Sequence, residues 1–168
     1  MISVGLPAPD FALPGVHAGR RGEFRLKDLK DRWVVLFFYP ADFSFVCPTE
    51  VRGFHARHTA FQQEGADILG VSVDPPSLHQ EWVKELGGIA YPLLSDEQRE
   101  VARRYDVLDP ETNRCQRTTY IVSPAGRVEY AVQSALNVGR SVEETLRVLM
   151  ALRTGRQCPA DWHPGDPT

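Results

Sequence analysis

The architecture of this chain follows from Trp33-Val34-Val35-Leu36-Phe37-Phe38-Tyr39-Pro40-Ala41-Asp42-Phe43-Ser44-Phe45-Val46-Cys47-Pro48-Thr49-Glu50. The uninterrupted β-formers up to Tyr39 predict a strand buried on both faces, which Pro40 ends. A helical pattern begins near Pro48, at a position where the missing N–H of proline costs nothing. Cys47 therefore lies where a strand gives way to a helix. The unpaired N–H groups at the start of a helix favour a thiolate there.

Strands and helices alternate on either side of this stretch. Residues 11–29 indicate short strands and turns. The later elements are expected to be a helix over 48–64, a strand over 66–73, a helix through Leu78, Trp82 and Leu86, a strand over 91–94, a helix over 97–105 and a hairpin of 118–122 and 128–132. The last helix is expected to start with the capping box of Ser141 and Glu144 and to end before Gly155. This order predicts an α/β fold with a mixed, parallel-dominated sheet, helices on both faces and the hairpin as an antiparallel edge.

The 168 residues predict one domain, with 155–168 as an irregular C-terminal tail. A hydrophobic content of 42% and a charged content of 24% are ordinary for a globular protein, and a net charge of −3 gives no reason to expect nucleic acid as a partner. No apolar stretch is long enough to span a membrane. The N-terminus has no signal-peptide pattern, so a cytoplasmic location is expected.

The three cysteines are Cys47, Cys115 and Cys158. Their odd number and wide spacing predict neither a disulfide framework nor a zinc site, and no metal or cofactor is expected. A free cysteine is usually a small buried hydrophobe, and Cys115 is expected to be one. If its strand extends upstream, Cys115 would share a face with Arg117.

Histidine does not explain activation of Cys47. His58 would lie about 16 Å further along the helix axis, and His55 would point about 80° away. The remaining histidines, His17, His79 and His163, are expected at the surface.

Other groups can complete a site around this cysteine. The Ser44 hydroxyl lies in the same loop, and Pro40 would hold that loop rigid and shield the thiolate from water. Arg117 opens the strand 118–122, where it is either a solvated strand-start residue or a donor to developing charge on a substrate.

Three separated motifs resemble the peroxiredoxins of the alkyl hydroperoxide reductase/thiol-specific antioxidant family, of the typical two-cysteine type. They are Pro40-x-x-x-Ser44-x-x-Cys47-Pro48-Thr49-Glu50, Arg117-Thr118-Thr119-Tyr120-Ile121 and Cys158-Pro159-Ala160-x-Trp162. The resemblance extends to the opening Gly5-x-x-Ala8-Pro9-Asp10-Phe11 and implies a thioredoxin-like fold with an N-terminal extension and a mid-chain insertion.

The resemblance also implies a site. Cys47 would attack the O–O bond of a hydroperoxide and become a sulfenic acid, with Pro40, Ser44 and Arg117 lining the peroxide site. Serine at position 44 replaces the commoner threonine and lacks the methyl group that restricts rotation. Glu50 would orient the arginine, or it would only complement the helix dipole. A core position is favoured for Trp82.

The same resemblance implies a partner subunit. Cys158 of a second chain would resolve the sulfenic acid, giving a homodimer linked by a Cys47–Cys158 disulfide, with assembly into a decamer left open. A thioredoxin-like or dedicated disulfide reductase would recycle it. One alternative is a redox-regulated holdase or peroxide sensor. A thiol-disulfide oxidoreductase is less favoured, because Glu50 stands where a Cys-x-x-Cys motif has its second cysteine.

Overall fold

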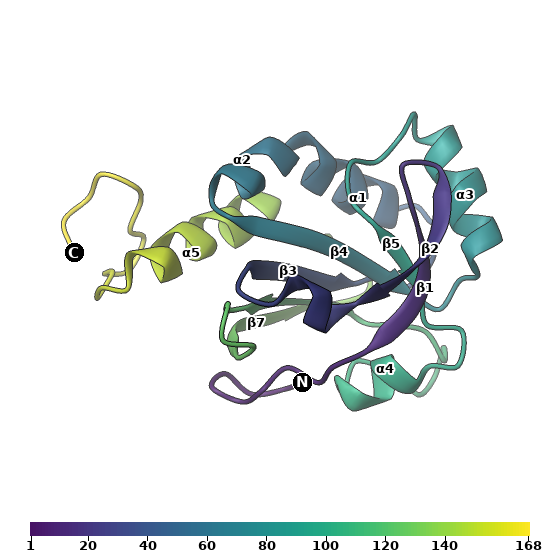
Figure 1. Cartoon of the computed structure of the whole chain (residues 1–168), viewed down its shortest axis with the longest axis horizontal. Helices are drawn as coiled ribbons and strands as arrows, with labels where there is room; N and C mark the ends of the chain where they lie inside the picture. Colours follow the sequence, from purple (N-terminus) through teal and green to yellow (C-terminus); the bar gives the residue numbers. More distant parts are fainter.

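A seven-stranded sheet in the order β2-β1-β5-β4-β3-β6-β7 forms the centre of the molecule (Figure 1). The computed structural model describes every residue from 1 to 168. Its strands are β1 (Ala12–His17), β2 (Arg20–Arg25), β3 (Trp33–Phe38), β4 (Ala66–Ser72), β5 (Leu93–Ser95), β6 (Arg117–Val122) and β7 (Val128–Ser134). β3 lies inside the sheet, parallel to β4 and antiparallel to β6, and its residues from Val34 to Phe38 are buried. Its apolar run is thus covered on both faces, as predicted.

The sheet is mixed, but the expectation that parallel pairs dominate is wrong. Only the β3–β4 and β4–β5 pairs are parallel. The pairs β1–β2, β1–β5, β3–β6 and β6–β7 are antiparallel. The physical reason is that the N-terminal segment forms a full hairpin, which pairs with β5 and extends the sheet on that side. The predicted hairpin of β6 and β7 extends it on the other side, with β7 at the edge.

The helices are α1 (Cys47–Ala56), α2 (His58–Gln63), α3 (Pro76–Glu85), α4 (Glu100–Arg104), α5 (Val142–Thr154) and the short 3-10 helix η1 (Leu26–Leu29). The expected helix over 48–64 is divided at Arg57, where φ of −102° and ψ of 7° depart from helical values. The capping box of α5 is confirmed, because the Glu144 N–H donates to Ser141 Oγ at 3.1 Å. Gly155 ends α5 in the left-handed conformation, with φ of 64°.

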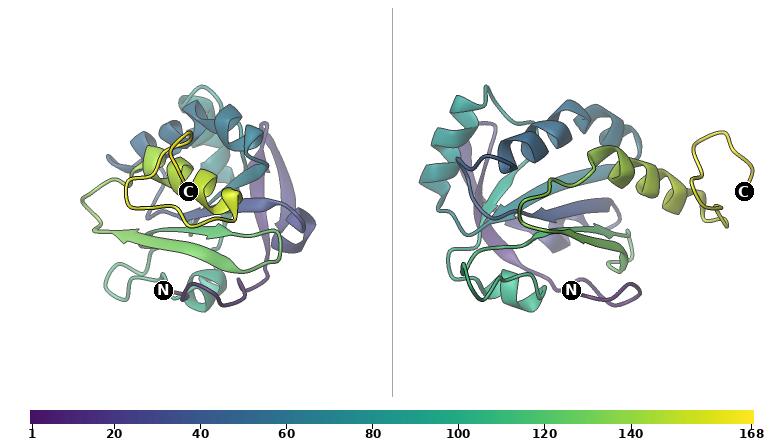
Figure 2. Two further views of the ribbon diagram at one scale, coloured as in Figure 1. Left: turned by 90° about the vertical axis from the view of Figure 1, so that its left-hand side faces the viewer. Right: turned by 180° about the vertical axis from the view of Figure 1, so that it is seen from behind.

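Helices cover both faces of the sheet and enclose two hydrophobic cores (Figure 2). Side chains from α1, α2 and α5 share one core with β3, and this core contains Cys47. The other core lies under α4 and contains Cys115. Cys47 and Cys115 are therefore buried in different cores.

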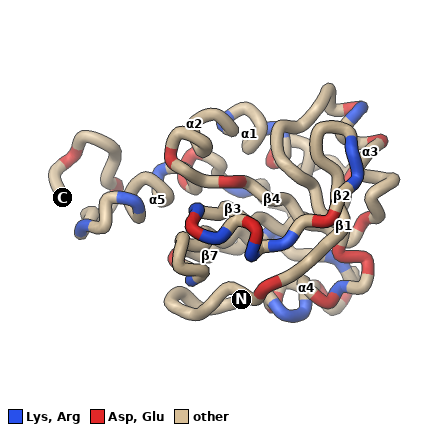
Figure 3. Tube along the Cα trace, viewed as in Figure 1, with Lys and Arg blue, Asp and Glu red and all other residues tan.

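The chain beyond α5 contains turns but no helix or strand, and it extends past the end of that helix (Figure 1). Trp162 is nevertheless buried. Its carbonyl accepts from Arg147 Nη1 at 2.9 Å, and its indole N–H donates to the Asp166 carbonyl at 3.1 Å. Acidic and basic residues are interspersed along the chain (Figure 3). No helix has the length and apolar character needed to cross a membrane.

Candidate active site

Cys47 is the first residue of α1 and is fully buried. The loop of residues 40–46 follows β3 and connects it to α1, which packs against the sheet. The Cys47 N–H donates to Ser44 Oγ at 3.4 Å. The Ser44 hydroxyl therefore satisfies a donor at the start of the helix as an acceptor, and its own O–H remains able to donate. Pro40 directly follows Tyr39 and is half-buried.

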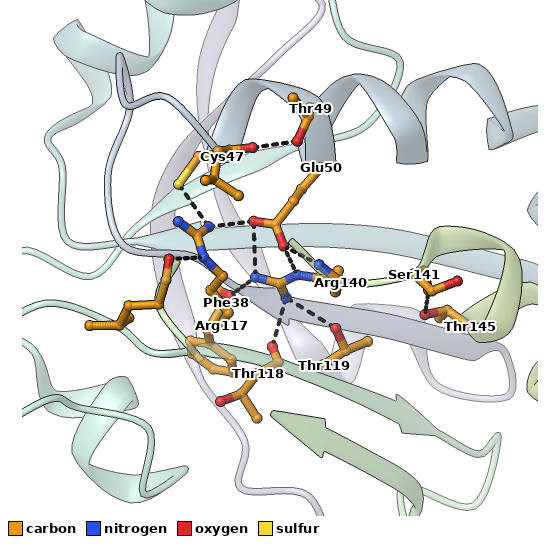
Figure 4. Close-up of polar contacts among 12 residues, drawn as sticks. Phe38, Cys47, Thr49, Glu50, Arg117, Thr118, Thr119, Arg140, Ser141 and Thr145 are labelled. Atoms are coloured by element: carbon orange, nitrogen blue, oxygen red, sulfur yellow. Dashed lines mark hydrogen bonds and ion pairs between the residues drawn. The ribbon is translucent and has the colours of Figure 1, made fainter. Parts of the chain in front are cut away.

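Arg117 places its guanidinium against the cysteine (Figure 4). It is the first residue of β6, which runs antiparallel to β3 with Thr118 opposite Phe38. The start of β6 therefore lies beside the end of β3, from which the Cys47 loop departs. Arg117 Nη1 lies 3.2 Å from Cys47 Sγ, and Arg117 Nε donates to the Leu136 carbonyl at 2.7 Å. This geometry places a fixed cation at the sulfur.

Glu50 lies in the same turn of α1 as Cys47 and is also buried. Its Oε1 accepts from Arg117 Nη1 at 2.6 Å. The same nitrogen thus contacts both the carboxylate and the sulfur. Glu50 lies in the first turn of α1, where a carboxylate complements the helix dipole, and it also contacts Arg117. Its geometry is therefore compatible with both roles considered from the sequence.

Arg140 is a fourth member of this cluster that sequence reasoning missed. Its Nε donates to Glu50 Oε2 at 2.6 Å, and its guanidinium lies 5.3 Å from the centre of the Phe37 ring. It also donates to the Phe38 and Thr118 carbonyls and to Thr119 Oγ1, at 2.6, 3.1 and 3.0 Å. In the sequence Arg140 resembles any loop arginine. The only signal is its position immediately before the helix cap Ser141.

The charged side chains around Cys47 carry a net positive charge. Arg117 and Arg140 carry two positive charges, and Glu50 supplies one negative charge. Burial lowers the pKa of Arg140, while the ion pair with Glu50 opposes that shift and keeps the guanidinium charged. Because uncompensated buried charge is costly, the remaining positive charge favours a negative sulfur.

The other cysteines lie away from this cluster. Cys115 precedes β6 and is fully buried in the opposite core, so it does not share a face of the sheet with Arg117. Burial raises the pKa of the Cys115 thiol. Cys158 follows α5, with its Sγ 3.4 Å from Thr154 Oγ1. Arg140, which contacts Glu50, comes just before the start of α5. Cys158 lies beyond the other end of this helix, whose 13 residues span about 20 Å. The structure therefore does not bring Cys158 to Cys47 of the same chain.

The expected surface position of His79 is wrong. Its side chain is fully buried, with Nδ1 2.6 Å from Asp42 Oδ2 and Nε2 3.0 Å from the Leu94 carbonyl. The physical reason is the helical period of α3. His79 lies three residues before the buried Trp82 and so faces the same way. Trp82 packs in the core that contains Cys47, as favoured from the sequence.

Comparison with known proteins gives consistent matches. The model of the AhpC/TSA family matches residues 4–131. A putative peroxiredoxin in the rubredoxin operon of Clostridium pasteurianum is 45% identical, over 97% of this chain and 96% of that protein. The putative peroxiredoxin YkuU of Bacillus subtilis is 43% identical, over 98% and 97%. The crystal structure of reduced Plasmodium vivax 2-Cys peroxiredoxin has a TM-score of 0.93 at 33% identity, covering 99% of this chain and 92% of that one.

Proposed function

The chain belongs to the AhpC/TSA family of peroxiredoxins and is a thiol peroxidase, and we propose that Cys47 is the residue that attacks the hydroperoxide. One observation carries this assignment. Arg117 Nη1 lies 3.2 Å from the Cys47 sulfur while the same nitrogen is held by Glu50 at 2.6 Å. A thiolate at this position is fixed in place and electrostatically stabilised before substrate arrives.

The first step transfers one oxygen atom to the sulfur. The Cys47 thiolate attacks the terminal oxygen of the hydroperoxide ROOH, the O–O bond breaks, and sulfur is oxidised to the sulfenic acid Cys–SOH. The leaving RO⁻ takes a proton and departs as an alcohol, or as water when the substrate is hydrogen peroxide. Negative charge moves from sulfur to the leaving oxygen, so donors near both atoms lower the barrier.

Three residues of the proposed site supply these conditions. Arg117 uses Nη1 and Nε for its contacts with protein, which leaves Nη2 to donate to the peroxide. The Ser44 hydroxyl lies at the start of α1 with its O–H able to donate. Pro40 lies at the entrance of the loop, has no N–H and shields the sulfur from water.

Resolution of the sulfenic acid is proposed to use Cys158 of a second chain in an antiparallel homodimer. The Cys158 thiol attacks the oxidised sulfur, an S–S bond forms and water leaves. The length of α5 between the two positions supports an intermolecular rather than an intramolecular bond. A thioredoxin-like or dedicated disulfide reductase then returns both thiols by exchange, which fits a reducing, cytoplasmic compartment.

The test is peroxide consumption together with a non-reducing gel and mass mapping after one equivalent of hydrogen peroxide. The wild-type chain should form a covalent dimer that contains the Cys47–Cys158 bond. Cys47→Ser should abolish peroxide consumption, whereas Cys158→Ser should keep the first turnover and lose the dimer. A monomer with a Cys47–Cys115 bond would overturn the role of Cys158. Undiminished turnover in Cys47→Ser would overturn the role of Cys47.

A further inference from the structure

A second buried ionisable pair, Asp42 and His79, lies outside the cluster of Figure 4. We propose that this pair clamps the loop of residues 40–46 in its closed position and thereby controls how often Cys47 leaves its buried site. Asp42 and His79 are then positioning residues and touch no substrate. The proposal rests on the proposed function, because it concerns the loop that carries the proposed nucleophile.

Asp42 makes three polar contacts to residues outside this loop. Its Oδ2 lies 2.6 Å from His79 Nδ1, and neither side chain is exposed. Its Oδ1 accepts from the Tyr39 hydroxyl at 2.8 Å, and its backbone N–H donates to Asp74 Oδ2 at 2.8 Å. Tyr39 follows β3, Asp74 follows β4 and His79 belongs to α3, so three separate segments of the fold hold one loop residue.

The hydrogen bonds of His79 fix where the protons of the Asp42–His79 pair lie. A carbonyl oxygen only accepts, so His79 Nε2 must donate to Leu94. The 2.6 Å contact from Nδ1 to Asp42 then contains one further proton, carried by the imidazolium or by the carboxylic acid. The pair is neutral overall in either form, which is what permits its burial. Burial raises the pKa of Asp42, and the hydrogen bonds from His79 and Tyr39 oppose that shift.

The residue after the clamp is strained. Phe43 has φ of 55°, in the left-handed region that is unfavourable for a bulky side chain. Such strain persists only where surrounding contacts hold the backbone. α3 supplies two such contacts, one from His79 to Asp42 and one from Trp82, whose ring centre lies 6.2 Å from that of Phe43. Beyond this point the loop is loosely covered, since Phe45 is 94% exposed.

A clamp here has a consequence for the catalytic cycle. Cys47 is 0% exposed, so its sulfur cannot reach a thiol of another chain until the loop and the first turn of α1 open. Closure keeps the sulfur against Arg117 for the attack on peroxide, and opening releases it. Strain at Phe43 favours opening, and the Asp42–His79 pair opposes it.

Two substitutions at position 79 separate the clamp from ordinary core packing. His79→Asn places an amide nitrogen where Nδ1 stood and retains donation to Asp42. His79→Gln places it where Nε2 stood and retains only donation to Leu94. Both variants remove the imidazole ring of His79 from the core. The readout is amide hydrogen exchange of residues 43–47 in the reduced protein, measured by mass spectrometry without peroxide.

His79→Gln should accelerate exchange of these amides about tenfold or more, because the buried Asp42 carboxyl group loses its hydrogen-bond donor, whereas His79→Asn should stay within about threefold of wild type. The rate constant for Cys47 oxidation should fall in the same order. Equal acceleration in both variants would show mere loss of packing and overturn the proposal. If neither His79 variant folds, Tyr39→Phe is a milder substitution that removes one hydrogen bond to Asp42. It should accelerate exchange of residues 43–47 severalfold. No change in its exchange would also overturn the clamp.

Tyr120→Phe removes a buried hydroxyl bond in the other core, to the Tyr105 carbonyl, and should leave loop exchange unchanged. Because exchange is measured without peroxide, its outcome does not depend on whether Cys47 and Cys158 act as proposed. Failure of the clamp and failure of the proposed function are therefore observed separately.

Discussion

Arg140 Nε lies 2.6 Å from Glu50 Oε2, and both side chains are almost completely buried. This ion pair supports the arginine that contacts Cys47, because the other carboxylate oxygen of Glu50 accepts from Arg117 at 2.6 Å. The Cys47 sulfur therefore lies at the end of a chain of buried contacts that runs from Arg140 through Glu50 to Arg117. Geometry of this kind fixes the sulfur before substrate binds.

Glu50→Gln should impair both stability and catalysis. The change leaves two buried guanidinium groups without a carboxylate, and breaking a buried ion pair typically costs about 3–5 kcal/mol. Arg117 would also lose its orientation, so we expect the rate constant for Cys47 oxidation to fall by about 10- to 100-fold. Urea denaturation and competition kinetics measure the two effects. Glu144→Gln, which breaks the more exposed pair with Arg147, is the control and should cost about 1 kcal/mol or less.

Arg140→Lys should be more damaging to stability than Arg117→Lys. The guanidinium of Arg140 donates to Glu50, to the Phe38 and Thr118 carbonyls and to Thr119, and one ammonium group cannot reach all of them. We expect Arg140→Lys to lower the free energy of unfolding by about 2–4 kcal/mol through these unpaired acceptors. Arg117→Lys should mainly slow peroxide reduction. An Arg140→Lys variant as stable as the wild type would contradict this assignment.

The comparison of these residues shows what could be predicted from the sequence. The position of Cys47 depends on local signals, namely an apolar strand, a proline and a helix start, and all lie within a few residues. The strand pattern that Arg117 opens left its role undecided, and only the family resemblance implied that it lines the site. The contacts of Arg140 and His79 could not be predicted, because their partners Glu50 and Asp42 lie 90 and 37 residues away.

The sheet gives the same lesson at a larger scale. β3, β4 and the β6–β7 hairpin have strong local patterns and were predicted closely. The pairing of β1 with β5 joins a strand expected within residues 11–29 to the strand expected over 91–94, and no local pattern specifies this antiparallel pair. Local chemistry therefore predicted the elements, whereas pairings over long sequence separations required the structure.

Cys115 should resist alkylation in the folded protein. Burial raises the pKa of its thiol, so little thiolate forms at pH 8, and its sulfur is shielded by the core. We expect iodoacetamide to modify Cys115 at least about 100-fold more slowly in the native protein than in urea. Mass mapping of the alkylated cysteines measures this ratio, and Cys158 serves as the half-buried comparison. Rapid native alkylation of Cys115 would contradict its structural role.

Alkaline pH should destabilise the fold through its buried tyrosines. Burial raises the pKa of Tyr39 and Tyr91 above their ordinary value. A group whose pKa is raised on folding contributes stability that is complete below its unfolded pKa, about 10, and is lost as pH rises above it. The free energy of unfolding should therefore fall between about pH 9.5 and 11. In urea titrations Tyr91→Phe should show a shallower fall, although it loses the 2.6 Å hydroxyl bond to the Val51 carbonyl. An identical slope in the variant would contradict this origin.

Substitutions at Ser44 test which part of this side chain matters. Its oxygen accepts from the Cys47 N–H at 3.4 Å, so Ser44→Ala removes both this cap and the hydroxyl proposed to contact peroxide. We expect Ser44→Ala to lower the rate constant for Cys47 oxidation by about tenfold, as for loss of one positioned donor. Ser44→Thr keeps the hydroxyl and adds a methyl group that restricts χ1, so its rate constant should equal or exceed that of the wild type. Stopped-flow oxidation of Cys47 by hydrogen peroxide measures both variants. If alanine and threonine slow the reaction equally, the side chain acts through packing of the loop and not through its hydroxyl.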